Sequence, residues 1–517
     1  MKANNRAWFI ELAAGIAAVF AAQAGAGVRP NIVIVLADDL GYGDVHCYDP
    51  EHSKIPTPNL DRLAAEGMRF TAAHSTSAVC SPTRYGLLTG RYPWRSRLQR
   101  GVLQPYDPPL IASNRLTLPA LLRAQGYHTA CIGKWHLGWQ WPRQDGQVVF
   151  DRPIAEGPTA RGFDYYFGTD VPNFPPYTFI VNDRVTVQPT EQFTGIKEMH
   201  LSYRGPMAPG WRFDRILPTL AAKAVEYIGA QATNVHPFFL YFPLTTPHEP
   251  IAPSERFKGR SGINGVADLI METDWALGQV MEALAEHGLT QNTLLIFTAD
   301  NGHSSYTGLE PFERAGHRVS GPYRGVKSTV WEGGHREPFV ARWPGVVKPG
   351  SRCDELICLT DLMATCAEIM GTRLPANAGE DSVSILPLLK GANKPVRRAV
   401  VTTSVQGRPA IQLGGWKLIL SPGSGGYGAQ PSDQQAAQSN LPPVQLYHLG
   451  NEPGELRNLQ AEQPRKVKAL TTLLERTTKN GRSTAGPKQT NDVEVDWSRT
   501  GAPSKNTEEK RNPKFQG

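Results

Sequence analysis

Cysteine is scarce in this chain of 517 residues. There are six, namely Cys47, Cys80, Cys131, Cys353, Cys358 and Cys366. They show none of the paired spacings that mark zinc sites, and they are few for an exported chain of this length. With 40% hydrophobic and 20% charged residues, the composition is that of a globular protein. The length predicts one large domain with a smaller companion.

Long hydrophobic runs are also missing after the N-terminus. No later segment approaches the roughly 18 uninterrupted apolar residues of a membrane span, so we expect no stable membrane insertion. Residues 1–26 have the features of a secretory signal peptide, because Lys2 and Arg6 precede an apolar core over residues 12–22 that ends in small residues. The expected location is therefore periplasmic or extracellular.

Runs of basic residues and internal repeats are missing as well. The formal net charge of +7 is mild for this length and is spread along the chain. Such a charge can help to attract an anionic substrate, although a solvated surface explains it equally well. We therefore expect no nucleic-acid partner.

Within residues 27–394, apolar segments alternate with helical patterns of about ten residues or more. Residues 31–37 are continuously apolar and β-branched, which is typical of a strand buried on both faces of a parallel sheet. The other predicted strands are 129–133, 238–242 and 293–298, and the predicted helices are 58–67, 116–125, 216–231 and 266–286. This alternation predicts an α/β fold with a large, mostly parallel sheet flanked by helices.

The C-terminal part has a different pattern. Short strands and one helix over residues 395–480 predict a small α+β domain, and residues 481–517 are polar enough to form an extended or disordered tail. Residues 423–428 spell G-x-G-x-x-G, but the segment opens onto a loop rich in Gln, Ser and Pro rather than a helix. We therefore do not interpret it as a dinucleotide site.

Polar side chains follow four of the predicted strands. The carboxyl ends of strands in an open α/β sheet are where ligands bind, and a chance scatter of polar loops need not produce this pattern. The residues in question are Asp38, Asp39, Lys134, His136, His248, Asp300 and Asn301. The three aspartates and the asparagine among them are hard oxygen donors, which suit Ca²⁺ or Mg²⁺ better than Zn²⁺.

Cys80 lies beside a Ser-Pro turn and ahead of a short apolar run. This context allows a reactive thiolate near a helix start, but an isolated cysteine is more often buried or disulfide-bonded. The longer run Cys80-Ser81-Pro82-Thr83-Arg84, followed by LLTGR, resembles the C-x-P-x-R signature of the type I sulfatases, in which the Cys is converted to formylglycine. The resemblance implies an alkaline-phosphatase-like fold and a maturation enzyme that modifies Cys80.

The resemblance also implies a metal site and catalytic roles. Asp38, Asp39, Asp300 and Asn301 resemble the ligands of the family's metal site, with the modified Cys80 at the same ion, which is expected to be Ca²⁺, with Mg²⁺ as the alternative. Lys134 and His136 match the motif GKWHLG, His248 matches TPHEP, and Lys327 follows YRGV. Lys134, His248 and Lys327 would hold sulfate oxygens, His136 would act as a base, and Arg84 would hydrogen-bond the hydrated aldehyde.

Further matches at residues 331–338, 342–345 and 446–459 are similar to the branch that contains arylsulfatase A and N-acetylgalactosamine-6-sulfatase. The resemblance thus implies a sulfatase acting on a sulfated saccharide. Two alternatives stay open: a phosphomonoester or phosphonate-ester hydrolase of the same superfamily, and a protein that binds sulfated glycans without turnover if Cys80 is not matured. His303, His317 and His335 are left between pocket-lining and structural roles.

Overall fold

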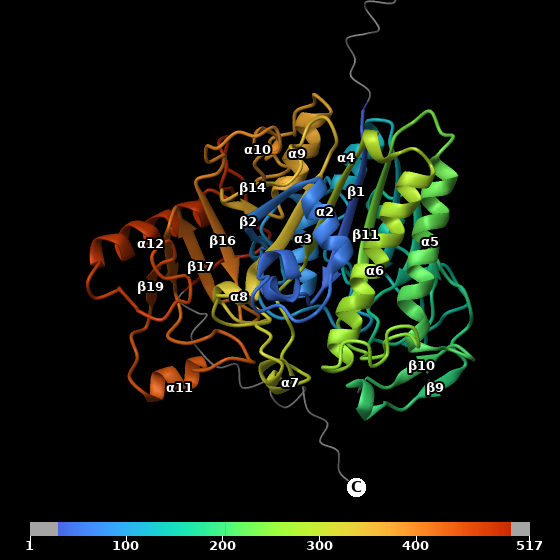
Figure 1. Ribbon diagram of the computed structural model, residues 1–517, viewed down its shortest axis with the longest axis horizontal. Helices are drawn as coiled ribbons and strands as arrows, with labels where there is room; N and C mark the ends of the chain where they lie inside the picture. Colours follow the sequence, from blue (N-terminus) through green and yellow to red (C-terminus); the bar gives the residue numbers. More distant parts are fainter. Residues whose placement is uncertain (1–28, 202, 498–517) are drawn as a thin grey trace, which may run out of the picture.

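The computed structural model describes residues 29–201 and 203–497. The predicted signal peptide lies outside the described residues, and so do residues 498–517 of the predicted tail. The chain forms a large central sheet with helices on both faces, and a smaller four-stranded sheet lies at one end (Figure 1). This is the predicted α/β architecture, with a smaller C-terminal α+β region.

The middle of the large sheet is parallel. β1 (Asn31–Asp38) lies between β11 (Phe238–Pro247) and β12 (Thr293–Ala299), and the parallel ladder continues from β11 through β3 (His128–Lys134) to β6 (Tyr165–Thr169). Antiparallel or short strands extend both sides: β13 (Arg336–Arg342), β2 (Met68–His74), β14 (Ser351–Cys353), β15 (Ile357–Cys358), β7 (Ile180–Val181) and β8 (Arg184–Val185). The sheet is therefore mixed, with its parallel part at the centre.

Both faces of the sheet are covered, which explains why β1 is apolar along its length. Val33, Val35 and Ala37 belong to the core on the face of the long helices, whereas Ile32 and its alternate neighbours belong to the core on the opposite face. The first face carries α2 (Pro58–Glu66), α5 (Ile216–Gln231) and α6 (Gly265–Glu286), and the second carries α3 (Cys80–Thr89), α4 (Leu118–Ala124) and α9 (Asp361–Ile369). Side chains of successive β1 residues thus enter two different cores.

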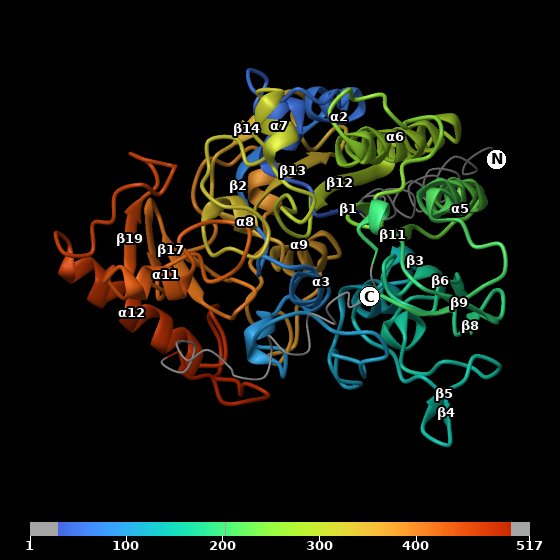
Figure 2. The same ribbon diagram turned by 90° about the horizontal axis from the view of Figure 1, so that it is seen from below.

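The smaller sheet is antiparallel throughout. Its strands, in sheet order, are β16 (Ala399–Thr403), β17 (Pro409–Leu413), β18 (Trp416–Ile419) and β19 (Gln445–His448). The amphipathic helix α12 (Pro464–Lys479) packs on it through Leu470 and Leu474, and Figure 2 shows this layer beside the main body. The remaining short elements are β4 (Arg143–Gln144), β5 (Gln147–Val148), β9 (Glu191–Phe193), β10 (Gly205–Met207), α7 (Glu310–Arg314), α8 (Glu332–His335), α10 (Leu386–Leu389) and α11 (Asp433–Gln438).

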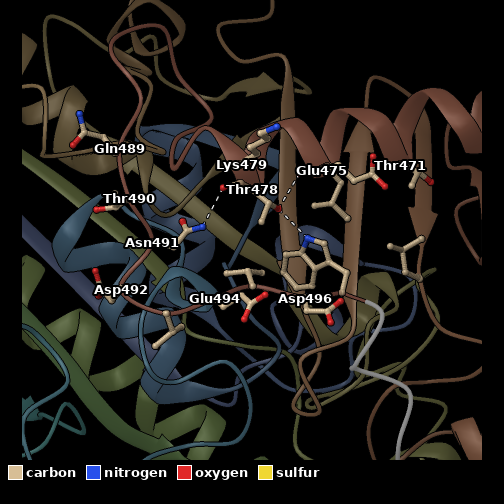
Figure 3. Close-up of a pocket in the computed structure, with 15 residues that line it drawn as sticks. Thr471, Glu475, Thr478, Lys479, Gln489, Thr490, Asn491, Asp492, Glu494 and Asp496 are labelled. Carbon is tan, nitrogen blue, oxygen red and sulfur yellow. Dashed lines mark hydrogen bonds between the residues drawn. The ribbon is translucent and has the colours of Figure 1, made fainter.

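After α12 the chain folds back as a segment without helix or strand. Asp492 pairs with Arg91, and the ring of Trp497 packs edge-on against Trp94 with 5.1 Å between centroids. A cavity of about 840 Å³ lies between α12 and residues 489–497 (Figure 3). None of the predicted site residues lines it.

The structure also describes the cysteines and the hydrophobicity of the helices. All six cysteines are free thiols. Among the helices of residues 29–201 and 203–497, none combines the length and the apolar character that a bilayer crossing needs.

Candidate active site

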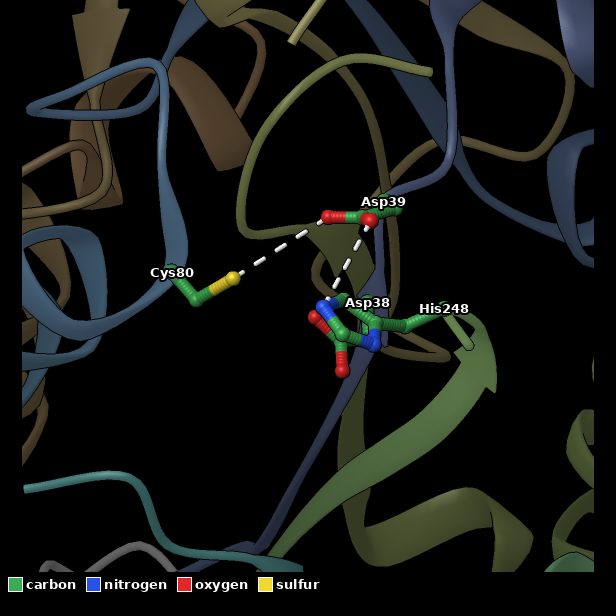
Figure 4. A group of neighbouring side chains, drawn as sticks. All are labelled: Asp38, Asp39, Cys80 and His248. Carbon is green, nitrogen blue, oxygen red and sulfur yellow. Dashed lines mark hydrogen bonds and ion pairs between the residues drawn. The ribbon is translucent and has the colours of Figure 1, made fainter. Parts of the chain in front are cut away.

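The ends of four neighbouring strands bring the predicted site residues to one edge of the sheet. Asp38 is the last residue of β1, and Asp39 follows it with a left-handed backbone, φ 69°. Lys134 ends β3, and His248 directly follows β11. Asp300 and Asn301 come directly after β12. Parallel strands point the same way, so residues remote in sequence converge here (Figure 4).

Cys80 is the first residue of α3, a fully buried helix, and its Sγ lies 4.0 Å from Asp39 Oδ1 (Figure 4). The first turn of a helix has backbone N–H groups without intrahelical partners, which favour a negatively charged group. Burial nevertheless raises the pKa of Cys80 to about 12, although Lys134 and Lys327 oppose that rise. The side chain is therefore a protonated thiol at neutral pH and a poor thiolate nucleophile.

Arg84 lies one helical turn after Cys80, so both side chains leave the same face of α3. Its Nε and Nη2 donate to Asp300 Oδ2 at 2.9 and 2.7 Å, and its Nη1 donates to the carbonyl of Lys134 at 3.0 Å. The i, i+4 spacing within C-x-P-x-R thus ties the helix that carries Cys80 to the ends of β12 and β3.

Two buried lysines neutralise the aspartate pair. Lys134 Nζ donates to both oxygens of Asp38 at 3.0 and 2.7 Å, and Lys327 Nζ donates to Asp39 Oδ2 at 2.6 Å. Burial by itself would raise the pKa of Asp38, but the charges of Lys134, Arg84 and Lys327 outweigh it and hold that pKa well below its ordinary value. Asp38 is therefore ionised at neutral pH, and it offers a carboxylate to any cation bound here.

The polar atoms at this edge fit a hard divalent cation. One ligand atom each from Asp38, Asp39, Cys80 and His248 lies within 4.8 Å of the others. Asn301 Nδ2 donates to Asp39 Oδ1 at 2.8 Å, whereas Asn301 Oδ1 is buried and has no hydrogen-bond partner among the described residues. A buried amide oxygen without a partner, next to two carboxylates, is an oxygen that Ca²⁺ or Mg²⁺ would coordinate.

Asp300 differs from the other predicted ligands. Its Oδ2 receives both hydrogen bonds from Arg84, and its Oδ1 accepts the backbone N–H of Asp39 at 3.2 Å. Burial and the neighbouring Asp38 charge raise its pKa to about 6. The structure therefore brings Asp38, Asp39 and Asn301 together, places Asp300 beside them in contact with Arg84, and adds His248 to the compact group.

Both histidines of the site are buried and neutral. His136 Nε2 donates to the carbonyl of Leu103 at 3.1 Å, so Nδ1 is the basic nitrogen of the neutral ring, and it has no partner within the described part of the chain. Burial lowers the pKa of His136 well below its ordinary value. His248 Nδ1 donates to the carbonyl of Glu249 at 2.7 Å, which leaves its Nε2 3.8 Å from Asp39 Oδ2.

The three further histidines considered in the sequence, His303, His317 and His335, have buried partners that favour structural roles. His303 Nδ1 and His317 Nε2 both contact the carboxylate of Asp44, at 2.7 and 2.9 Å. Burial would raise the pKa of Asp44, but the two histidines lower it to about 2. His335 lies against His74 in a separate buried cluster. Sequence reasoning missed Asp44, because no motif surrounds it, and it also missed Tyr306, whose ring lies over Lys327.

The profile of the Sulfatase family matches residues 30–372. The chain is 34% identical over 493 residues to an N-acetylgalactosamine-6-O-sulfatase of Bacteroides thetaiotaomicron, covering 86% of this chain and 93% of that protein. It is 34% identical over 474 residues to arylsulfatase A of Homo sapiens, covering 88% of this chain and 86% of that one.

Solved structures of related proteins have the same fold as this chain. A protein described in work on glycosaminoglycan metabolism by Bacteroides thetaiotaomicron superposes with a TM-score of 0.77 at 33% identity, covering 87% of this chain and 99% of its own. A phosphonate monoester hydrolase of Agrobacterium radiobacter superposes with a TM-score of 0.56 at 18% identity, covering 87% of this chain and 95% of its own, which shows a shared fold alone.

Proposed function

The chain belongs to the sulfatase family, whose named members are sulfuric ester hydrolases, and we propose that it hydrolyses sulfate esters of a saccharide through a formylglycine made from Cys80. The observation that best supports this proposal is the position of Cys80. It lies at the buried start of α3, beside Asp39 and the cations Lys134 and Lys327. A sulfate group at this point would meet positive charge and backbone N–H groups together.

The protonation of Cys80 favours modification over direct use of the thiol. A thiol with a pKa of about 12 is almost wholly un-ionised at neutral pH. Hydrated formylglycine supplies two hydroxyls on one carbon, one for attack on sulfur and one from which a proton is removed when sulfate is expelled. Three N–H groups of Arg84 are used by Asp300 and Lys134, which leaves donor capacity for the hydrated aldehyde.

The chain's own residues would hold the ester and move the protons. Lys134 and Lys327 are fixed by Asp38 and Asp39, so their ammonium groups are oriented before a sulfate arrives. His248 presents Nε2 toward the Asp39 carboxylate. Once that nitrogen carries a proton, which the charges of Asp38 and Asp39 favour, it would donate to a sulfate oxygen and help to protonate the leaving oxygen. His136 is neutral with Nδ1 unprotonated, which is the state that a general base requires.

Asp38, Asp39, Asp300 and Asn301, together with the modified side chain of residue 80, would hold Ca²⁺, with Mg²⁺ as the alternative. The unpartnered Asn301 Oδ1 and the ionised Asp38 support this assignment. A bound dication would offset the negative charge of the sulfate and polarise its S–O bonds.

The substrate and the cellular route complete the proposal. The relatives named N-acetylgalactosamine-6-O-sulfatase and arylsulfatase A favour a sulfated sugar. An exported protein with a matured Cys80 needs a formylglycine-generating or equivalent enzyme as a partner. These assignments follow from the family and from the N-terminal sequence.

Substrate turnover tests the function. We expect sulfate release from 4-nitrophenyl sulfate and from at least one member of a panel of sulfated saccharides, with kcat/KM for 4-nitrophenyl phosphate lower by orders of magnitude. Faster cleavage of the phosphate would favour the phosphoester hydrolase alternative. Binding of the sulfated sugars without turnover by protein with matured Cys80 would favour the glycan-binding alternative.

Peptide mass spectrometry tests the maturation of Cys80 separately. Trypsin releases residues 70–84, which contain Cys80 and end at Arg84. In active protein we expect this peptide to carry formylglycine in place of cysteine. Full activity with only unmodified Cys80 would contradict the mechanism.

A further inference from the structure

The glycine-rich segment 423–428 packs against the loop that carries Lys327. It leaves the smaller sheet after β18, and α11 begins only at Asp433. The backbone of Tyr427 makes two hydrogen bonds with Ser328, since Tyr427 N donates to Ser328 Oγ at 2.9 Å and Ser328 Oγ donates to Tyr427 O at 2.6 Å. Ser328 directly follows Lys327, so the C-terminal region contacts the candidate active site here.

Glycine is required at two points of this contact. A Cβ on Gly426 would lie 2.3 Å from the carbonyl oxygen of Ser328, and a Cβ on Gly428 would lie 2.2 Å from Ser305 Oγ. At Gly426 only a residue without a side chain allows the two backbones to approach so closely, and at Gly428 the left-handed backbone, φ 86°, also favours glycine. The glycines of this segment thus serve backbone packing, which gives the G-x-G-x-x-G pattern a structural explanation.

The segment is also fixed from its other side by a carboxylate. Asp433 Oδ1 accepts from Gly425 N at 2.9 Å and from Ser421 Oγ at 2.6 Å, while Asp433 Oδ2 accepts from Arg408 Nε at 2.6 Å. A loop held at both ends presents its side chain in one place. That side chain is Tyr427.

Tyr427 stacks on Tyr306, which comes from the loop after β12. The ring centroids are 5.5 Å apart with an interplanar angle of 30°, and the two hydroxyls are hydrogen-bonded. Lys327 Nζ lies 5.1 Å from the Tyr306 centroid, and the same Nζ holds Asp39. Tyr306 is 40% exposed. An aromatic pair that reaches solvent therefore borders the buried groups proposed to hold sulfate.

We propose that Tyr306 and Tyr427 form a stacking platform for the sugar ring that carries the sulfate, so that the C-terminal region contributes to substrate recognition. This inference rests on the proposed function. A sulfate bound at Lys327 leaves its attached ring beside these tyrosines, where the solvent-exposed part of the aromatic pair would pack against the C–H groups of a pyranose and the phenol hydroxyls would hydrogen-bond to its hydroxyls. The substrate class is a sulfated pyranose.

The test compares a sugar ester with inorganic sulfate. In Tyr306→Ala and Tyr427→Ala, the KM for N-acetylgalactosamine-6-sulfate should rise about tenfold with kcat nearly unchanged, because stacking is equal in the ground and transition states. The inhibition constant of inorganic sulfate, measured against 4-nitrophenyl sulfate, should stay within about twofold, since sulfate alone needs only the buried groups. Tyr306→Phe and Tyr427→Phe retain the rings and should restore most of the affinity.

A glycine variant tests whether the position of Tyr427, and not only its presence, matters for binding of the sugar. Gly426→Ala leaves both tyrosines in the sequence but pushes the segment away from Ser328, so it should also raise KM for the sugar ester. Equal loss of inorganic sulfate binding in the alanine variants would mean that the tyrosines only position Lys327, which overturns the platform. An unchanged KM for the sugar would overturn it as well.

Wild-type turnover of the two kinds of ester distinguishes failure of the platform from failure of the proposed function. Wild-type protein that hydrolyses 4-nitrophenyl sulfate but no sulfated sugar would overturn the platform while leaving the sulfatase activity in place. Wild-type protein with matured Cys80 that hydrolyses neither would refute the proposed function itself.

Discussion

At the scale of single residues, the site depends on a few side chains whose partners are all buried. Cys80 contacts Asp39, and Asp39 is also the acceptor for Asn301 and Lys327. One carboxylate thus links the residue proposed to be modified, a proposed metal ligand and a proposed sulfate ligand.

Cys80→Ser should attack the ester slowly and fail to complete the cycle. Serine offers one oxygen for attack but no second hydroxyl from which His136 could remove a proton. Loss of that proton transfer alone should lower steady-state turnover by at least about 10²-fold. Peptide mapping after incubation with labelled aryl sulfate should find sulfate retained on residue 80, and sustained multiple turnover by this variant would contradict the role given to the second hydroxyl.

Asp39→Asn should remove bound calcium and activity together. The variant keeps the size of the side chain and a residue type that tolerates the left-handed backbone, but it removes the charge that Lys327 and the cation share. Calcium stoichiometry by atomic emission and kcat for 4-nitrophenyl sulfate are the measurements.

Asp44→Asn is the matched control for that change, because Asp44 is an equally buried carboxylate whose partners are His303 and His317. It should lower the stability by about 1.5–3 kcal/mol, the usual worth of a charged hydrogen bond, and still bind calcium. Normal calcium content in Asp39→Asn would show that the metal assignment is wrong.

At the scale of elements, a buried ion network joins the smaller sheet to the catalytic core. Lys417 on β18 donates to Glu332 of α8 at 2.9 Å and pairs with Glu455 at 2.8 Å. Glu332 N in turn donates to Glu455 Oε2 at 2.7 Å. All three side chains are at most 1% exposed. The two parts of the chain are therefore held together by charges that are shielded from water in the folded state and depend on one another for compensation.

Lys417→Met should destabilise the fold by about 3–5 kcal/mol at neutral pH, because it leaves Glu455 buried without its cation, while Glu332 keeps only Arg336, at 3.0 Å. Burial already raises the pKa of Glu455 to about 7, and without the opposing charge of Lys417 that pKa rises further above its unfolded value, so the folded state binds more protons than the unfolded state. Stability should then be regained as the pH falls and lost as it rises. Denaturant unfolding at pH 5 and pH 8 measures this, and an equal penalty at both values would contradict the assignment of the network.

At the scale of the whole molecule, buried neutral histidines make stability depend on pH. Burial lowers the pKa of His74 to about 3, although Glu332 opposes that shift. Its Nε2 is buried without a hydrogen-bond partner in the described chain. A histidine of this kind takes up a proton on unfolding between about pH 6.5 and pH 3. Its stabilising effect is present above the unfolded pKa and is lost as the pH falls.

His74→Gln should therefore flatten the acid limb of the stability curve. Between pH 6 and pH 4 the free energy of unfolding of the wild type should fall more steeply than that of the variant, by up to about 1.4 kcal/mol per pH unit for one proton. His52→Gln is a control, since His52 is only half-buried beside Asp49. Parallel curves for wild type and His74→Gln would show that His74 takes up no proton on unfolding.

The amino-acid sequence by itself determined the repeated strands and helices, because each is encoded by local periodicity and by end signals. Helix α5 was predicted at 216–231 and occupies Ile216–Gln231, and the predicted run 31–37 lies within β1. It also determined which strand ends carry charged residues and placed Cys80 in a motif with Arg84 four residues later. These signals are local, so they need no knowledge of the remaining chain.

Only the tertiary structure decided which of those polar groups touch. Asp300 lies beside Asp39 but contacts Arg84, His248 joins the compact ligand group, and His303 and His317 share Asp44 instead of lining a pocket. The pairing of Tyr306 with Tyr427 joins loops 121 residues apart, which no periodicity connects. Such contacts depend on the packing of strands and loops in three dimensions, where burial sets both the partners and the pKa values.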